Sequence, residues 1–167
     1  MTLPPEWSEF IGLLCGARVR FLVVGAHALA VLGRPRATGD LDILVEPTPV
    51  NAERLTGALR DFGFAVLARR GKEFAIPDRM VTLGRPPLRI DVMTSITGVS
   101  FAEAWRGRRT LLVGGHRIGF LGRAEFERNK RAAGRPQDLL DLELLSQVRP
   151  ARSRVAARRP RRSPRKG

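Results

Sequence analysis

Three aspartates give this sequence its clearest chemical signal. Asp40 and Asp42 alternate with large aliphatic residues in GDLDILV, residues 39–45, and Asp91 lies in a similar segment, LRIDVM, residues 88–93. Such alternation is typical of a strand with one buried face, so we expect the first pair on one face and Asp91 on a neighbouring strand. Clustered carboxylates repel one another unless a cation lies between them, and hard oxygen ligands suit Mg²⁺ or Mn²⁺. The pattern predicts a metal site for phosphoryl or nucleotidyl transfer.

Each of these residues also has a simpler interpretation. An Asp-x-Asp pair is common by chance, and most such pairs are solvated carboxylates at the end of a strand. For Asp91 the alternative is a carboxylate at the end of an edge strand, paired with Arg89.

The sequence before the aspartates favours a site. An apolar segment, residues 21–25, ends in glycine and leads into a predicted helix, residues 26–32. Strand, glycine and helix in this order direct backbone N–H groups at a phosphate. Gly25 and Ala26 are therefore predicted to contact nucleotide phosphates, and a tight strand-to-helix turn is the alternative.

The next loop carries two arginines. The segment GRPRAT, residues 33–38, is predicted to bring both guanidinium groups directly to the carboxylates. Arg36 and Thr38 are close enough in sequence to contact the nucleotide or to position Asp40, whereas Arg34 is a weaker candidate. For each of them the alternative is a surface loop held by a salt bridge or a turn hydrogen bond.

This order of motifs resembles a known family. Strand, glycine and helix, then Gly-x-x-Arg-x-Thr, then Asp-hydrophobic-Asp is similar to the DNA polymerase beta-type nucleotidyltransferase superfamily. The most similar branch is that of small bacterial proteins related to abortive-infection and toxin–antitoxin nucleotidyltransferases. Lys130 and the segment RPQDLLD, residues 135–141, resemble a second motif of this branch, Lys-x4-Arg-Pro-x-Asp-x-x-Asp. The matching segments span about residues 21–145.

The resemblance implies a fold and a reaction. The fold is α+β: a nucleotidyltransferase fold with a mixed β-sheet, packed helices and a C-terminal helical pair. The reaction is metal-dependent transfer of a nucleoside monophosphate from an NTP to an acceptor hydroxyl, such as an RNA 3′ end or a protein side chain. Asp40, Asp42 and Asp91 are the implied catalytic residues and ligands of Mg²⁺ or Mn²⁺. A role as a toxin–antitoxin component, with a cognate antitoxin or toxin as partner, is also implied.

The resemblance also bears on four further positions. Lys130 is expected to neutralise a triphosphate oxygen, and Asp138 to orient Lys130 or act as a general base. Asp141 is interpreted as structural. Ala26 departs from the motif, because many active members carry Gly-Gly or Gly-Ser here and alanine has no hydroxyl for the triphosphate. The second hypothesis is therefore a catalytically silent nucleotidyltransferase-like protein that binds nucleotide or nucleic acid, or acts as a partner subunit.

Composition bounds the class of protein. The 167 residues divide into a predicted domain, residues 1–148, and a basic tail, residues 149–167. No apolar segment approaches the roughly 20 residues that span a bilayer, and the N-terminus lacks the pattern of a secretory signal. The single cysteine, Cys15, excludes an internal disulfide. We expect a cytoplasmic protein without membrane association.

The formal net charge of +14 is distributed unevenly. Nine arginines and lysines and no acidic residue lie in residues 149–167. This tail lacks apolar periodicity, and we expect it to be disordered. A basic tail can hold RNA through phosphates without reading sequence, and the alternative is an extension without a function.

Periodicity and turn signals predict the remaining elements. Helices are expected at residues 5–18, 50–62, 101–105, 123–133 and 136–148. Strands are expected at residues 40–45, 74–76, 81–83, 88–93, 110–113 and 117–121, with another extended segment at 64–68. His27 is interpreted as a packed or capping residue and His116 as a solvated turn residue.

Overall fold

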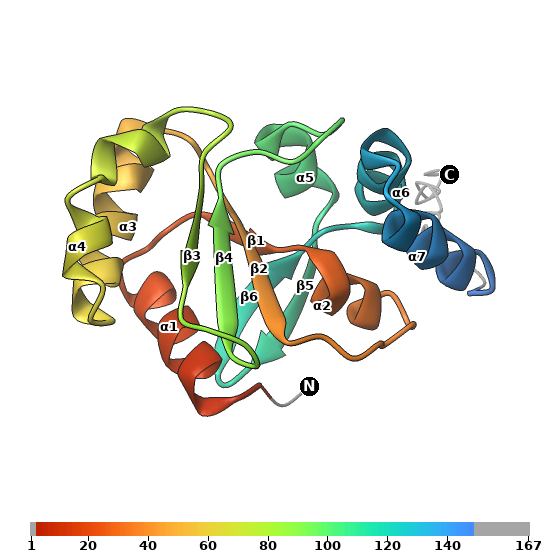
Figure 1. Ribbon diagram of the computed structural model, residues 1–167, viewed down its shortest axis with the longest axis horizontal. Coiled ribbons are helices and arrows are strands. Elements are labelled where there is room, and N and C mark those ends of the chain that lie inside the picture. The colour runs from red at the N-terminus through yellow and green to blue at the C-terminus, as the bar shows by residue number, and fades with distance from the viewer. Residues whose placement is uncertain (1–2, 149–167) are drawn as a thin grey trace, which may run out of the picture.

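The computed structural model describes residues 3–148, which form a six-stranded mixed sheet with helices on both faces (Figure 1). The strand order is β3-β4-β2-β1-β6-β5. The strands are β1 (Phe21–Val23), β2 (Asp40–Val45), β3 (Met80–Leu83), β4 (Arg89–Met93), β5 (Arg109–Val113) and β6 (His116–Phe120). The helices are α1 (Pro5–Gly16), α2 (Gly25–Val31), α3 (Pro49–Asp61), α4 (Ala65–Ala68), the 3₁₀ helix η1 (Gly71–Ala75), α5 (Phe101–Gly107), α6 (Arg123–Ala133) and α7 (Pro136–Ser146). The α+β class is confirmed, and the predicted tail lies outside the described residues.

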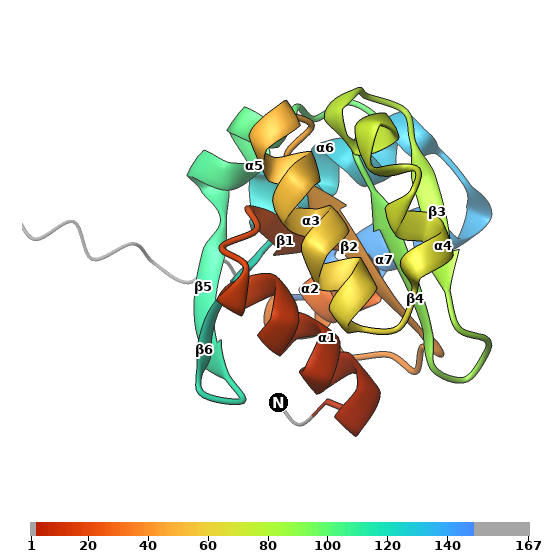
Figure 2. The ribbon, with the colours of Figure 1, turned by 90° about the vertical axis from the view of Figure 1, so that its left-hand side faces the viewer.

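The helices form two layers, one on each face of the sheet (Figures 1 and 2). α1, α3, α4 and η1 cover one face, where Phe10, Ile43 and Leu55 belong to the larger core. α2, α5 and the C-terminal pair α6 and α7 cover the other face around Leu22 and Phe126. Within residues 3–148, none of the helices combines the length and the apolar character needed to cross a membrane.

The alternation in β2 fixes the face on which the carboxylates lie. Leu41 and Ile43 are fully buried in the larger core, so Asp40 and Asp42 project from the opposite face, toward α2 and the C-terminal pair. β4 runs parallel to β2, with Asp42 and Asp91 as register partners. The prediction that a neighbouring strand brings Asp91 beside the pair is confirmed.

Asp91 does not lie on an edge strand. β3 pairs antiparallel with β4, with Thr82 opposite Asp91, and β3 itself forms that edge of the sheet. The edge-strand alternative for Asp91 is therefore wrong, although the ion pair with Arg89 that it included is present.

The two segments expected to be extended are helical instead. Residues 64–68 enter α4, in which Ala68 is buried while Val66 is exposed. Residues 74–76 overlap η1, where Phe74 is buried and Ile76 is exposed. Every residue of the two segments is apolar, but only Ala68 and Phe74 are buried. A single helical turn against α3 is enough to bury one side chain of each segment without a strand partner. Periodicity cannot distinguish these cases in such short segments.

The link between α6 and α7 sets the position of the C-terminal pair. α6 ends at Ala133 and is capped by Gly134, which has a left-handed φ of 63° and donates its N–H to the carbonyl of Lys130. Pro136 then begins α7 with a backbone that suits the first turn of a helix. The short turn brings Asp138, in the first turn of α7, beside Lys130 near the end of α6.

Candidate active site

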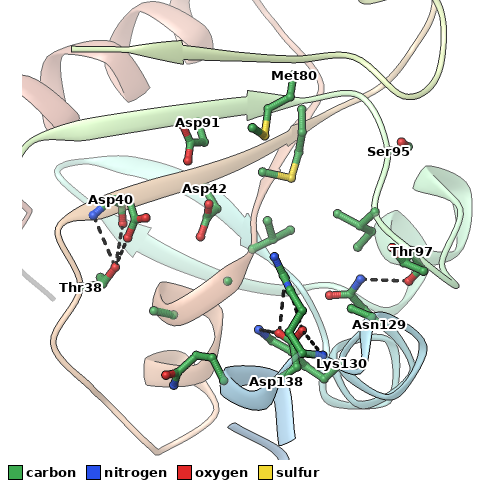
Figure 3. A pocket seen from close by; sticks show the side chains of 18 of the residues that line it. Thr38, Asp40, Asp42, Met80, Asp91, Ser95, Thr97, Asn129, Lys130 and Asp138 are labelled. Carbon is green, nitrogen blue, oxygen red and sulfur yellow. Dashed lines mark hydrogen bonds and ion pairs between the residues drawn. The ribbon is translucent and has the colours of Figure 1, made fainter. Parts of the chain in front are cut away.

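A cleft of about 740 Å³ opens on the face of the sheet that carries the aspartates. β2 and β4 provide one side, and the first turn of α2 and the α6–α7 pair provide the others (Figure 3). The structure brings together in this cleft every residue predicted for the site: Gly25, Ala26, Arg36, Thr38, Asp40, Asp42, Asp91, Lys130 and Asp138.

Asp42 is the least compensated carboxylate of the cleft. Among the described residues no side chain or backbone group donates a hydrogen bond to it, whereas Asp40 and Asp91 both have partners. Burial, followed by the charges of Asp40 and Asp91, raises the pKa of Asp42 to about 6, and the charges of Lys130 and Arg89 oppose this shift only in part. A cation placed beside Asp42 would relieve both causes.

Arg89 provides positive charge to the other two aspartates. Its Nη2 lies 2.6 Å from Oδ2 of Asp40 and 3.1 Å from Oδ2 of Asp91. The hydroxyl of Thr82 donates a hydrogen bond to Oδ1 of Asp91 at 2.7 Å. From the sequence, Arg89 was expected only as the partner of Asp91 in the edge-strand alternative. The signal for a larger role was its place two residues before Asp91 in an alternating strand, which puts both on one face.

Thr38 positions Asp40. The Thr38 hydroxyl donates a hydrogen bond to the Asp40 carboxylate. This contact agrees with the predicted role of Thr38 in positioning Asp40. This hydrogen bond is the main cause that lowers the pKa of Asp40, aided by the charge of Arg89 and opposed by burial. Two carboxylates on one strand face therefore have pKa values shifted in opposite directions, a division that often separates roles in an active site.

Gly25 makes room for Asp42. Its φ of +59° favours glycine, and a Cβ built on it would lie 2.0 Å from Oδ2 of Asp42. The glycine therefore allows the start of α2 to approach the carboxylate more closely than any side chain would permit. Ala26 is buried and lines the same wall. Backbone N–H groups in the first turn of a helix have no partner within that helix, so this wall can offer donors to an anion.

Lys130 extends from α6 toward the aspartates but is itself held in an ion-pair cluster (Figure 3). Its Nζ lies 2.7 Å from Asp138 and 2.9 Å from Asp141, and all three residues are buried. Arg135 adds a contact of 2.7 Å to Asp138. Burial alone would raise the pKa of Asp138, but hydrogen bonds from Arg135 and Lys130 outweigh it and lower that pKa. The geometry thus agrees with Asp138 as the residue that orients Lys130.

The arginines of the 33–38 loop do not bind the cleft aspartates, contrary to the prediction. Nε of Arg36 lies 2.8 Å from Asp141, and Nε of Arg34 donates to the carbonyl of Leu144 at 3.1 Å. Both guanidinium groups therefore attach the loop to α7. Arg36 still lines the cleft. Asp141, fully buried between Arg36 and Lys130, joins the loop, α6 and α7, which matches its structural interpretation.

The chemistry of the cleft fits a divalent cation, although the carboxylates are not gathered around one point. Within residues 3–148 no three His, Cys, Asp or Glu side chains are arranged to hold a metal ion. Arg89 lies between Asp40 and Asp91 and bonds to both. The donor set itself, three aspartates on adjacent strands with one left unpaired, is the hard oxygen set that Mg²⁺ and Mn²⁺ prefer. Asp40, Asp42 and Asp91 are thus the residues that fit such an ion.

Comparisons with known proteins identify the fold. No family model matches the sequence, and no curated protein matches it. A crystal structure of a candidate nucleotidyltransferase from Thermotoga maritima superposes with a TM-score of 0.52 and 16% sequence identity, covering 87% of this chain and 93% of that one.

Two further structures are similar at TM-scores below 0.5. One is the lincosamide antibiotic adenylyltransferase LnuA with lincomycin bound, at a TM-score of 0.47 and 12% identity, covering 89% of this chain and 99% of that one. The other is an antigenic nucleotidyltransferase-like protein from Paracoccidioides brasiliensis, at 0.46 and 13%, covering 84% and 73%. From the Thermotoga comparison and the topology we conclude that this chain has the nucleotidyltransferase fold.

Proposed function

We propose that this protein is a metal-dependent nucleotidyltransferase that moves a nucleoside monophosphate from an NTP to an acceptor hydroxyl and releases pyrophosphate. The observation that carries the proposal is the state of Asp42. This carboxylate is half-buried, has no partner among the described residues, and lies in register with Asp91 beside Asp40. A fold selected only for stability gains nothing from leaving a half-buried carboxylate uncompensated, whereas a cation-binding site requires one.

The surrounding residues suit the parts of such a reaction. Asp40, Asp42 and Asp91 would hold Mg²⁺ or Mn²⁺, which when bound neutralises charge on the triphosphate and on the leaving pyrophosphate. The first turn of α2, at Gly25 and Ala26, would bind phosphate oxygens through its backbone N–H groups.

The C-terminal pair supplies the cationic side of the cleft. Lys130 is fixed by Asp138 and Asp141 and therefore presents its charge to the cleft in one position. Arg135, whose side chain is 73% exposed at the cleft, can follow the triphosphate as it enters. Electrostatic stabilisation of this preorganised kind costs no rearrangement during the reaction.

The acceptor and the biological setting are finer parts of the proposal. We propose an RNA 3′ end or a protein side chain as the acceptor, within a toxin–antitoxin pair, because this is what the sequence resemblance implies. The basic tail, residues 149–167, supports RNA through its nine cationic residues. Asp138, the other acid that lines the cleft within residues 3–148, is already paired with Lys130 and Arg135, so a polycationic acceptor is less well suited to this cleft.

The test is transfer of label from α-³²P NTPs, one at a time, with Mg²⁺ or Mn²⁺ and total cellular RNA. Asp42→Asn removes the charge of the unpaired carboxylate, and Asp61→Asn, on an exposed residue at the end of α3, is the matched control. We expect label on RNA or on protein with the wild type and with Asp61→Asn, and none with Asp42→Asn. Equal labelling by all three proteins would contradict the role of Asp42 in transfer, and no labelling by any of them would favour the catalytically silent alternative.

A further inference from the structure

Arg89 occupies an unusual position for an arginine in this cleft. It begins β4 on the same face as Asp91 and is the register partner of Asp40 on β2. A single nitrogen, Nη2, contacts both carboxylates, at 2.6 Å and 3.1 Å. The guanidinium therefore stands between the two acids, where a shared cation would have to bind.

The rest of the Arg89 guanidinium is weakly held. Its Nε is buried and has no hydrogen-bond partner among residues 3–148. The side chain is 38% exposed, and within residues 3–148 its ion pairs go only to the two aspartates. One nitrogen therefore makes all of these contacts, and the exposed part of the side chain leaves the guanidinium room to turn toward solvent. By contrast, the guanidinium of Arg36 contacts both oxygens of Asp141, through Nε and Nη2, in a two-point arrangement.

One guanidinium cannot satisfy three carboxylates. With Arg89 in place Asp40 and Asp91 are compensated and Asp42 is not. A divalent ion carries twice the charge of an arginine and accepts several oxygen ligands, so it can compensate all three. It can do so only if Nη2 leaves the space between Asp40 and Asp91, because the cation and the guanidinium need the same oxygens.

We propose that Arg89 is the resident counter-ion of the metal-free cleft and that a divalent metal must displace it to bind. Arg89 is thus a positioning residue that keeps Asp40 and Asp91 close together without the metal and competes with the metal for them. Once displaced, its guanidinium remains at the cleft, where the metal would then hold the three aspartates. An anionic oxygen of the incoming triphosphate is then its natural partner, which couples metal binding to substrate binding. This inference rests on the proposed function.

The competition predicts that loss of the arginine tightens metal binding. Mn²⁺ is titrated into the full-length protein, and free Mn²⁺ is followed by electron paramagnetic resonance, with no substrate present. Arg89→Met keeps most of the stem and removes the charge, and we expect the Kd for Mn²⁺ to fall by about 10-fold or more. Arg85→Met removes the same charge from the exposed turn before β4, away from the cleft. This control is expected to bind Mn²⁺ as the wild type does.

The outcomes separate this inference from the proposed function. If the wild type binds Mn²⁺ and Arg89→Met binds it equally or more weakly, the competition is wrong and the metal site stands. If neither protein binds Mn²⁺, both fail together. A gain shared by Arg85→Met would also overturn the inference, because it would reflect net charge alone.

A second variant guards against misfolding of Arg89→Met. Arg89→Lys keeps one positive charge but carries it on a shorter side chain as a more strongly hydrated ammonium group, so its hold on the two carboxylates is weaker. We expect its Kd for Mn²⁺ to lie between those of the wild type and Arg89→Met. A Kd equal to or higher than that of the wild type in a folded Arg89→Lys protein would contradict the displacement.

Discussion

Two clusters of three charged groups lie side by side in this protein, and their electrostatics differ. In the Lys130 cluster (Lys130, Asp138 and Asp141) every charge has partners, and Arg36 and Arg135 complete it. In the cleft cluster (Asp40, Asp42 and Asp91) one arginine serves two carboxylates and Asp42 has no partner among the described residues.

We infer from this difference that the Lys130 cluster stabilises the fold and that the cleft cluster binds a cation. A fully paired buried cluster holds α6, α7 and the 33–38 loop in place, and removing one member leaves the others uncompensated. An undercompensated cluster costs stability in the metal-free protein, and the binding of a cation can recover that cost. The following predictions test this contrast, from the largest expected effect to the smallest.

Lys130→Met is expected to destabilise the protein most. It leaves Asp138 and Asp141 buried without their shared cation, a type of change that costs about 3–5 kcal/mol. Urea denaturation gives the free energy of unfolding, and Lys72→Met, at an exposed lysine of η1, is the matched control. A cost below about 1 kcal/mol would show that the Lys130 cluster does not support the fold.

Gly25→Ala is expected to disturb both stability and the cleft. The added methyl group collides with Asp42, and a left-handed alanine is itself strained, so we expect a cost of about 2–4 kcal/mol with loss of transfer activity. Gly114→Ala separates the two causes, because Gly114 has a similar φ of +58° but nothing within 4 Å of the new Cβ. If both variants unfold at the same urea concentration, the collision with Asp42 does not contribute to the loss of stability.

Asp42→Asn is expected to stabilise the metal-free protein while it abolishes activity. The pKa of Asp42 is about 6 in the folded state against an ordinary 3.8, so the folded protein holds this proton more tightly than the unfolded chain does. The contribution of Asp42 to stability is therefore present below about pH 4 and lost as the pH rises through about 6. In EDTA the variant should exceed the wild type by about 2 kcal/mol at pH 8, with the difference vanishing toward pH 4.

The measurement is urea denaturation across this pH range, with Asp61→Asn treated in parallel. Asp61 is exposed, and this control should follow the wild type at every pH. An Asp42→Asn protein that is less stable than the wild type at pH 8 would mean that the carboxylate is compensated in solution.

Ala26→Ser is expected to have the smallest effect. The added hydroxyl lies on the phosphate-facing wall of the cleft and can donate one hydrogen bond to the triphosphate, which corresponds to roughly 3–10-fold tighter binding of ATP. Calorimetric titration with Mg²⁺ and ATP measures this change in affinity. Weaker binding of ATP by the serine variant would place the triphosphate elsewhere.

Local sequence patterns were sufficient to predict the strands that carry the cleft cluster. Alternation in β2 and β4 placed Asp40, Asp42 and Asp91 on one face, and both strands formed where expected. The prediction that residues 64–68 and 74–76 are extended was wrong. Each segment buries so few side chains that contact with α3 decides its conformation.

Long-range partners could not be predicted from the sequence. Arg36 lies 105 residues before Asp141, and nothing near Arg36 distinguishes a bond to α7 from a bond to the adjacent Asp40. The partners of Lys130 were easier to predict, because the single turn between α6 and α7 limits what its ammonium group can reach. The lack of a partner for Asp42 could be seen only in the structure, because it depends on which of the neighbouring carboxylates Arg89 contacts.

The most direct test of the contrast is thermal unfolding of the full-length protein in EDTA and in Mn²⁺. A ligand that binds only the folded state raises the Tm. We predict that Mn²⁺ raises the Tm of the wild type by several degrees and leaves that of Asp42→Asn unchanged. A wild-type Tm that does not respond to Mn²⁺, or an equal rise in Asp42→Asn, would contradict the claim that the cleft cluster is built to receive a metal.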